Sequence, residues 1–291
     1  MLKKYAAAVM TLLSITLFAE PLNVLTIGNS FADSVFVYLP AIAEKAGREL
    51  VLERANLPGC TLQRHWTLAE AEKPAYKGKS LRAILESKKW DIVTVQQASG
   101  DSWQPETYEP YLTSLIEYVK KYAPSAEVVI QQTWSYRFDE PRLAAWNITS
   151  GEMFEKLSAA YSDAAKRHDL SMIPTGNAVD LARRTQQPQF VEFPLSALEN
   201  LEYPAPLPDQ TGSFVNGVRW GTDKNGDHVL LHDSYHLNIR GQYLQACLWF
   251  GFLFDENPAD IRFAPQNLPD DDAEFLRDIA KTTLENINGK R

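Results

Sequence analysis

The stretch VLTIGNSF, residues 24–31, decides the fold that we expect for this chain. Its first four residues are β-branched or apolar and Gly28 ends the run, which is typical of a buried strand. A helical pattern follows from residue 34, so Ser30 lies in a tight turn between a strand and a helix. A serine in such a turn exposes its hydroxyl at the carboxyl edge of the sheet, and neighbouring backbone N–H groups can point at an oxyanion.

Outward from this stretch, strand and helix patterns alternate five times. Strands are predicted at 24–27, 50–52, 90–95, 126–130 and 171–174, and helices at 34–47, 79–89, 107–122, 151–168 and 177–186. This alternation predicts an α/β protein, a three-layer α/β/α sandwich around a five-stranded parallel sheet with right-handed crossovers. Ligands bind such sheets at the carboxyl ends of the strands, so we expect a site in the turns after the first three strands.

Residues 188–232 interrupt the alternation. They are rich in Pro, Gly and Asn, and they predict an extended surface excursion that contains a hairpin. The hairpin strands are expected at 218–220 and 229–231, around a turn at Asn225-Gly226. A buried helix at 239–254 and an amphipathic helix at 270–287 complete the chain. Because no repeat or linker divides the sequence, we expect a single domain over residues 20–291.

Residues 1–19 have the layout of a signal peptide. Lys3 and Lys4 precede an apolar run from Tyr5 to Phe18, and Ala19 is a small residue at the expected cleavage site. The run is short for a membrane span. We therefore expect export to the periplasm or the exterior, with no membrane insertion after cleavage. The alternative is an uncleaved N-terminal anchor.

The chain is acidic, with 37 Asp and Glu residues against 29 Lys and Arg and a net charge of −8. Loss of residues 1–19 would remove two lysines and no acid, which changes the net charge to −10. This balance argues against a nucleic-acid partner and suits a neutral small-molecule or glycan substrate. The two cysteines, Cys60 and Cys247, could form one disulfide or remain two buried thiols. The oligomeric state stays open.

A catalytic serine needs a base, and the chain offers five histidines. His236 lies in the stretch HDSYHLN, residues 232–238, just before the last buried helix. An acid three residues before a histidine in a turn can hold the Nδ1 atom of the ring, which makes Asp233 the expected partner. Two other readings stay open: Ser30 as a helix N-cap only, and the Asp-x-x-His pattern as a cap or a pair of metal ligands.

Four segments together resemble the SGNH, or GDSL-type, hydrolases, and most closely an exported bacterial branch catalogued as a domain of unknown function. They are IGNSF at 27–31, LPGCTL at 57–62, DIVTVQQAS at 91–99 and DSYHLNIRG at 233–241, in the order of the family. The resemblance implies a flavodoxin-like SGNH fold with Ser30 as nucleophile, His236 as base and Asp233 as the residue that orients the base. It also implies an oxyanion hole that includes the backbone N–H groups of Ser30 and Gly59.

One segment departs from the family pattern. The superfamily usually has Gly-x-Asn-Asp after the third strand, and that Asn gives the third oxyanion donor, whereas this chain has Gln96 and Gln97. A Gln amide offers similar N–H donors, and only one of two neighbouring strand residues can face the site. We predict that Gln97 serves as this donor. The alternative is that both amides only satisfy loop backbone.

Further side chains near these segments are candidates for substrate binding. His65 follows the Gly59 turn, and aromatic rings that follow predicted strands could stack on a sugar or simply pack in the core. The candidates are Asn29, Gln96, His65, Trp103 and Trp134.

Together these observations predict a serine esterase that removes a small acyl ester, such as an O-acetyl group on a carbohydrate. The Ser-His-Asp mechanism requires no metal and no organic cofactor. One alternative is a non-catalytic carbohydrate-binding protein on the same fold, and another is an ester hydrolase of the lipase or thioesterase type. A third is metal-dependent hydrolysis that uses Asp233, His236 and His232.

Overall fold

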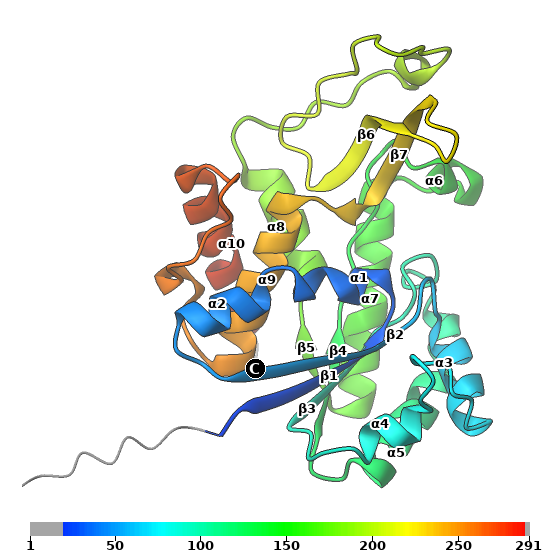
Figure 1. Cartoon of the computed structure of the whole chain (residues 1–291), viewed down its shortest axis with the longest axis vertical. Coiled ribbons are helices and arrows are strands. Elements are labelled where there is room, and N and C mark those ends of the chain that lie inside the picture. Colours follow the sequence, from blue (N-terminus) through cyan, green and yellow to red (C-terminus); the bar gives the residue numbers. More distant parts are fainter. Residues whose placement is uncertain (1–19, 289–291) are drawn as a thin grey trace, which may run out of the picture.

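A five-stranded parallel sheet forms the centre of the computed structural model, which describes residues 20–288 (Figure 1). The strand order is β2-β1-β3-β4-β5, and every neighbouring pair is parallel. The strands are β1 (Leu22–Gly28), β2 (Leu50–Asn56), β3 (Ile92–Val95), β4 (Glu127–Gln131) and β5 (Ser171–Ile173). This confirms the predicted α/β class, and the strand order is that of flavodoxin-like sheets.

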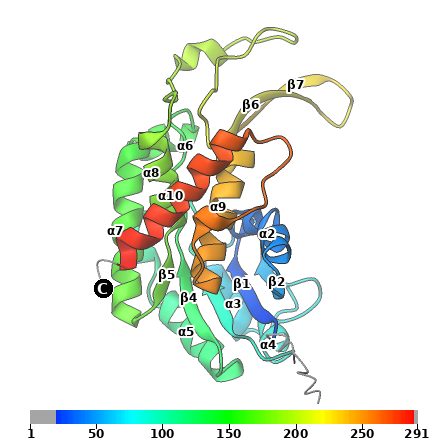
Figure 2. The same ribbon diagram turned by 90° about the vertical axis from the view of Figure 1, so that its left-hand side faces the viewer.

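Helices cover both faces of the sheet (Figure 2). One layer consists of α2 (Leu39–Lys45), α9 (Ile239–Phe254) and α10 (Asp270–Asn288). The other consists of α3 (Leu62–Glu70), α4 (Leu81–Leu85), α5 (Tyr111–Tyr122) and α7 (Ser150–His168). The helix α8 (Thr175–Thr185) contacts α7, α9 and α10. The shorter helices are α1 (Ser30–Asp33) and α6 (Pro141–Trp146), with 3-10 turns at Ser34–Phe36, Pro105–Thr107, Leu195–Leu198 and Pro258–Asp260.

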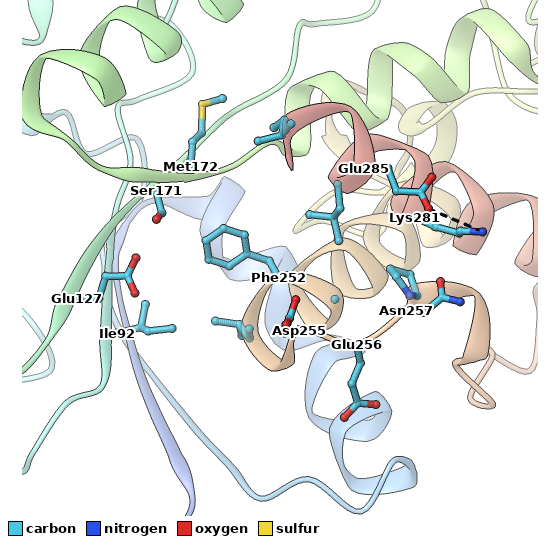
Figure 3. A pocket seen from close by; sticks show the side chains of 15 residues that line it. Ile92, Glu127, Ser171, Met172, Phe252, Asp255, Glu256, Asn257, Lys281 and Glu285 are labelled. Carbon is cyan, nitrogen blue, oxygen red and sulfur yellow. Dashed lines mark ion pairs between the residues drawn. The ribbon is translucent and has the colours of Figure 1, made fainter. Parts of the chain in front are cut away.

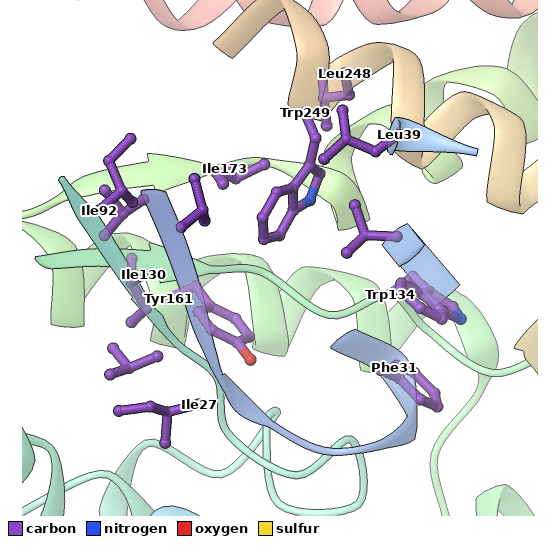
Figure 4. Packing of buried hydrophobic residues seen from close by; sticks show 14 of the residues in the cluster. Ile27, Phe31, Leu39, Ile92, Ile130, Trp134, Tyr161, Ile173, Leu248 and Trp249 are labelled. Atoms are coloured by element: carbon purple, nitrogen blue, oxygen red, sulfur yellow. The ribbon is translucent and has the colours of Figure 1, made fainter. Parts of the chain in front are cut away.

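The hydrophobic core lies on both sides of the sheet, because its inner strands are apolar on both faces. Leu25 and Ile27 of β1 are fully buried, and all four residues of β3 are buried as well. Trp249 packs against the sheet from α9 and Tyr161 packs from α7 (Figure 4). Parallel strands covered on both faces form continuous apolar runs, and this is why the sequence located them.

Some helices depart from the sequence prediction. The predicted helix at 34–47 is interrupted, since α1 begins at Ser30 and α2 begins only at Leu39. Pro40 explains the break, because proline is tolerated in the first turn of a helix and not in its interior. The sequence prediction misses α3 and α6, although Thr61 caps α3 by accepting a hydrogen bond from the N–H of Arg64.

A second, two-stranded sheet lies beyond the carboxyl edge of the main sheet (Figure 1). In it, β6 (Val215–Thr222) pairs antiparallel with β7 (His228–Leu237), so both strands are longer than the predicted hairpin. Asp233 and His236 therefore lie on β7 and not in a turn, as the sequence had suggested. The reason is that the ladder continues past the predicted strand end, with Gly217 opposite Asp233 and Val215 opposite Leu237.

Among residues 20–288, no helix is long and apolar enough to cross a membrane. The predicted signal peptide, residues 1–19, lies outside the described residues. Export therefore stays a prediction.

Candidate active site

Ser30 is the first residue of α1, directly after β1. Asn29 is the N-cap of this helix, and its Oδ1 atom accepts a hydrogen bond of 3.0 Å from the N–H of Phe31. Asn29 and not Ser30 is therefore the N-cap of α1. The Ser30 hydroxyl is available for another partner. Asn29 itself is buried, so it shapes the turn and does not offer the substrate contact that we predicted.

The Ser30 hydroxyl meets a histidine 206 residues further along the chain. Ser30 Oγ lies 2.8 Å from His236 Nε2, and His236 Nδ1 lies 3.1 and 3.2 Å from the two carboxylate oxygens of Asp233. A ring that donates its Nδ1–H to a carboxylate presents Nε2 as an acceptor, so His236 can take the Ser30 proton. The three residues predicted as nucleophile, base and orienting acid are therefore neighbours in the structure.

Three hydrogen-bond donors hold the Asp233 carboxylate. Besides the ring of His236, the backbone N–H of His236 donates to Oδ1 over 3.1 Å, and Asn216 Nδ2 donates to Oδ2 over 2.9 Å. Burial alone would raise the pKa of Asp233, but these hydrogen bonds favour the charged form and lower the pKa well below its usual value. Asp233 is thus an anion at neutral pH and can stabilise a protonated His236.

Asn216 is a site residue that no motif in the sequence indicates. It lies on β6, and its contact with Asp233 depends on the pairing of β6 with β7. The Asn225-Gly226 turn was the available signal, but the predicted hairpin stopped before reaching Asn216. Extending the antiparallel register from that turn would have placed Asn216 near Asp233.

Two backbone N–H groups are candidates for the oxyanion hole. Those of Ser30 and Gly59 donate no hydrogen bond to any other residue in the described part of the chain. Their loops are joined, because Leu57 N–H donates to Gly28 O over 3.1 Å and Asn29 Nδ2 donates to Cys60 O over 3.4 Å. Gly59 has a φ of +58°, a conformation that glycine adopts without strain.

Gln97 does not have the role that the sequence predicted for it. Its Nε2 atom donates to both the carbonyl and the hydroxyl oxygen of Thr107, each over 3.0 Å. Its Oε1 atom accepts from the N–H groups of Leu62 and Ala98. Since both amide N–H bonds are used, Gln97 has no donor left for an oxyanion, and the amide instead ties the loop after β3 to its neighbours.

Gln96 and His65 are buried and do not line the cleft above the triad. The Gln96 amide has no hydrogen-bond partner within residues 20–288. The His65 ring lies 2.9 Å from Gly28 O through Nε2 and 2.8 Å from the Tyr76 hydroxyl through Nδ1. Burial lowers the pKa of His65 to about 4, so the ring is neutral and holds the turn before Ser30. Both predictions of substrate contact are therefore wrong.

The two candidate tryptophans have different surroundings. Trp134 lines the cleft, but its ring stacks on Phe31 with 4.1 Å between centroids, and its Nε1 donates to Tyr235 O. Trp103 packs against Trp146 and is not among the residues of the cleft. Trp134 is thus a buried wall of the site, and the prediction for Trp103 finds no support.

An open cleft of about 330 Å³ lies over the triad. Ser30, Asp233 and His236 line it together with Asn216 and Val37, whose side chain is 48% exposed. A larger cleft, of about 590 Å³, lies at the amino ends of β3, β4 and β5, on the opposite edge of the sheet (Figure 3). It contains none of the predicted site residues, so the smaller cleft is the candidate active site.

The residues proposed as metal ligands are not gathered around one point. His232 Nε2 bonds to Asp139 Oδ2 over 3.0 Å, and no group of three His, Cys, Asp or Glu side chains suited to a metal ion occurs between residues 20 and 288. Cys60 and Cys247 are both free and buried, which is the second of the two alternatives for the cysteines.

Comparison with known proteins places the chain in a family. Residues 23–193 match the family described as "Domain of unknown function (DUF4886)". No curated protein matches the chain. A DUF4886 family protein from Bacteroides uniformis has a similar crystal structure, with 23% sequence identity and a TM-score of 0.71 over 91% of this chain and 95% of that one. A GDSL-like lipase from Bacteroides thetaiotaomicron is 10% identical, with a TM-score of 0.46 over 82% of this chain and 92% of that one.

The family match spans more than half of the chain and agrees with the resemblance found in the sequence. The Bacteroides uniformis structure shows that the sandwich fold is shared over nearly the full length of both proteins. This chain belongs to the DUF4886 family.

Proposed function

We propose that this protein is a serine esterase with Ser30 as its nucleophile. The observation that carries the proposal is the distance of 2.8 Å between Ser30 Oγ and His236 Nε2, with Asp233 bound to the other ring nitrogen. A serine hydroxyl is a weak nucleophile at neutral pH, and an adjacent, oriented imidazole activates it. The pair lines an open cleft, so a substrate can reach it.

The reaction follows from this arrangement. Ser30 Oγ attacks the acyl carbonyl carbon while its proton moves to His236 Nε2, and the N–H groups of Ser30 and Gly59 stabilise the negative oxygen. His236 then gives the proton to the leaving alcohol, and an acyl ester remains on Ser30. Water, deprotonated by the same ring, attacks this ester and releases the carboxylic acid and the free serine.

The favoured substrate is a small acyl ester, with an O-acetyl group on a carbohydrate as the leading case. The cleft volume of about 330 Å³ is near the lower end of the range for small-molecule sites, which favours a short acyl group over a long one. Predicted export would bring the enzyme into contact with extracellular glycans.

Hydrolysis of p-nitrophenyl acetate by the wild type and by Ser30→Ala tests the proposal. We expect the wild type to hydrolyse p-nitrophenyl acetate. The kcat of Ser30→Ala should be at least about 1,000-fold lower than that of the wild type, because the triad acts as a unit. Release of acetate from acetylated glycans, and a series of esters and thioesters with longer acyl chains, separate the acetylesterase from a lipase or thioesterase. A wild type that is inert toward all these esters would contradict the proposal.

A non-hydrolytic carbohydrate-binding protein is the second candidate, and one observation favours it. The side chain of Gln97 is fully bound to Thr107 and the loop backbone, so the third oxyanion donor of the superfamily is missing at this position. Loss of one such donor reduces transition-state stabilisation by about 3 kcal/mol. This corresponds to a rate about 100-fold lower, which an esterase assay still detects.

A further inference from the structure

Arg183 is a partly buried cation, and its guanidinium forms no direct ion pair among residues 20–288. It lies on α8, and its Nη1 atom donates to the carbonyl oxygen of Ser135 over 3.0 Å and to the hydroxyl of Ser135 over 2.9 Å. Its Nη2 atom is buried and has no hydrogen-bond partner among residues 20–288. A buried guanidinium with a free N–H donor is unfavourable unless an anion satisfies it.

The nearby carboxylates are already paired with other arginines. Asp139 accepts two hydrogen bonds of 2.6 Å from Arg137, and Asp180 pairs with Arg184 over 2.7 Å. Burial lowers the pKa of Arg183 to about 10, so the side chain is still charged at neutral pH. One positive charge is therefore left uncompensated inside the protein.

A cavity of about 160 Å³ lies beside Arg183. Arg183, Ser213 and the paired Arg137 line it beside three phenylalanine residues, and Glu192, which is exposed, is the single carboxylate among its lining residues. The polar side chains and the small volume suit a charged group of a few atoms and exclude a whole sugar ring.

The cavity lies close to the active site along the chain. Phe214 lines the cavity and Asn216 lines the catalytic cleft, and two residues of extended chain span at most about 7 Å. Trp134 of the cleft also directly precedes Ser135, to which Arg183 is bound. A ligand that extends from the cleft could therefore place one group in the cavity.

We propose that the Arg183 cavity binds the carboxylate of an acidic sugar, so that the esterase acts on an acylated glycan that contains uronic acid. A carboxylate fits because the cavity has one uncompensated positive charge, and a guanidinium can bind both oxygens of a monoanion. This proposal rests on the proposed function, because the bound carboxylate would be part of the substrate of the esterase. The negative net charge of the protein is screened beyond about 8 Å, so a local cation can still bind such a group.

Calorimetric titration of the Ser30→Ala protein with sodium glucuronate tests this, since binding is then measured without hydrolysis. We expect glucuronate to bind more tightly than glucose and than inorganic phosphate at neutral pH. Arg183→Met should weaken glucuronate binding at least 10-fold. Arg219→Met, at an exposed position of β6 outside the cavity, is the control and should change the affinity less than twofold. Glu192→Gln removes the competing carboxylate and should tighten binding.

Glu192→Gln also keeps the test valid if Arg183→Met does not fold, because Arg183 supports Ser135 as well. Equal affinities for glucuronate and glucose, or tighter binding of phosphate, would overturn the inference. So would an equal loss of affinity in Arg183→Met and Arg219→Met, or unchanged binding in Glu192→Gln. Because hydrolysis of p-nitrophenyl acetate is measured separately, failure of this inference can be told apart from failure of the esterase proposal.

Discussion

Asp233 links the hairpin to the chemistry of Ser30, because its carboxylate orients the ring that accepts the serine proton. Hydrogen bonds from His236 and Asn216 favour its charged form. Replacing the carboxylate by an amide keeps the shape and changes which ring nitrogen carries the proton. The effect should therefore appear in the rate and hardly in the fold.

For Asp233→Asn we predict a kcat about 10,000-fold lower for p-nitrophenyl acetate, with an unchanged circular dichroism spectrum. Asn216→Ala removes only one hydrogen bond to a charged group and should lower kcat about 10- to 100-fold. A loss in Asn216→Ala as large as that in Asp233→Asn would show that Asn216 does more than hold the carboxylate. Unaltered turnover in Asp233→Asn would exclude Asp233 from the mechanism.

His65 predicts a dependence of stability on pH. Burial lowers its pKa in the folded protein to about 4, below the value of about 6.5 in the unfolded chain. Between these values the unfolded chain binds a proton that the folded protein does not bind, so stability falls as the pH drops from 6.5 to 4. Above pH 6.5 both states are neutral, and His65 makes no contribution to the pH dependence.

Urea unfolding of the wild type and His65→Gln between pH 4 and 7 measures this contribution. As the pH falls over that range, the free energy of unfolding of the wild type should decrease by on the order of 3 kcal/mol more than that of the variant. His228→Gln, at an exposed position of the hairpin, is the control and should follow the wild type. Parallel curves for the wild type and His65→Gln would contradict a buried neutral His65.

At the level of elements, a buried ion pair in the loop between β4 and α6 attaches the hairpin to the body of the protein through its further hydrogen bonds. Asp139, in the loop between β4 and α6, is fully buried and accepts hydrogen bonds from Arg137 and from His232 of β7. Arg137 also donates to Gln210 and Ser213, which precede β6. These contacts fix the strand that carries Asp233 and His236 above the turn that carries Ser30.

Asp139→Asn should therefore reduce both stability and activity. Removing one partner of a buried pair leaves Arg137 without its counter-ion, which destabilises a protein by about 3–5 kcal/mol. We expect faster hydrogen exchange of the β6 and β7 amides and a lower kcat at temperatures where the variant is folded. Asp227→Asn, at an exposed turn of the same hairpin, should change stability by less than about 0.5 kcal/mol. If the β6 and β7 amides exchange at similar rates in Asp139→Asn and Asp227→Asn, Asp139 does not attach the hairpin to the rest of the protein.

The elements that the sequence predicted well have strong local patterns. The buried strands are continuous apolar runs, and the strand-to-helix turn at Ser30 follows directly from the first of them. The sequence does not indicate α3 or α6, which are only 9 and 6 residues long. It places Asp233 in a turn because the long pairing of β6 with β7 has no local signal. The occupied amide of Gln97 was equally hidden, because its partners Thr107 and Leu62 lie 10 and 35 residues away along the chain.

At the scale of the whole molecule, the site is assembled from two parts of the chain. The family match ends at residue 193, whereas Asp233 and His236 follow the excursion and lie just before α9. The buried helix α9 packs on the same side of the sheet as α2 and contacts the hairpin strand β7, so the fold brings the base to the nucleophile. The order of motifs in the sequence predicted that Ser30 and His236 lie close together, and in the structure Ser30 Oγ lies 2.8 Å from His236 Nε2.

The most direct test of the account is covalent labelling with p-nitrophenyl phosphonate esters followed by peptide mass spectrometry, which locates the nucleophile without knowledge of the substrate. We expect a single adduct on Ser30, formed at a much lower rate in His236→Ala and absent in Ser30→Ala. An adduct on another serine, or an active wild type that remains unlabelled at Ser30, would contradict the central claim.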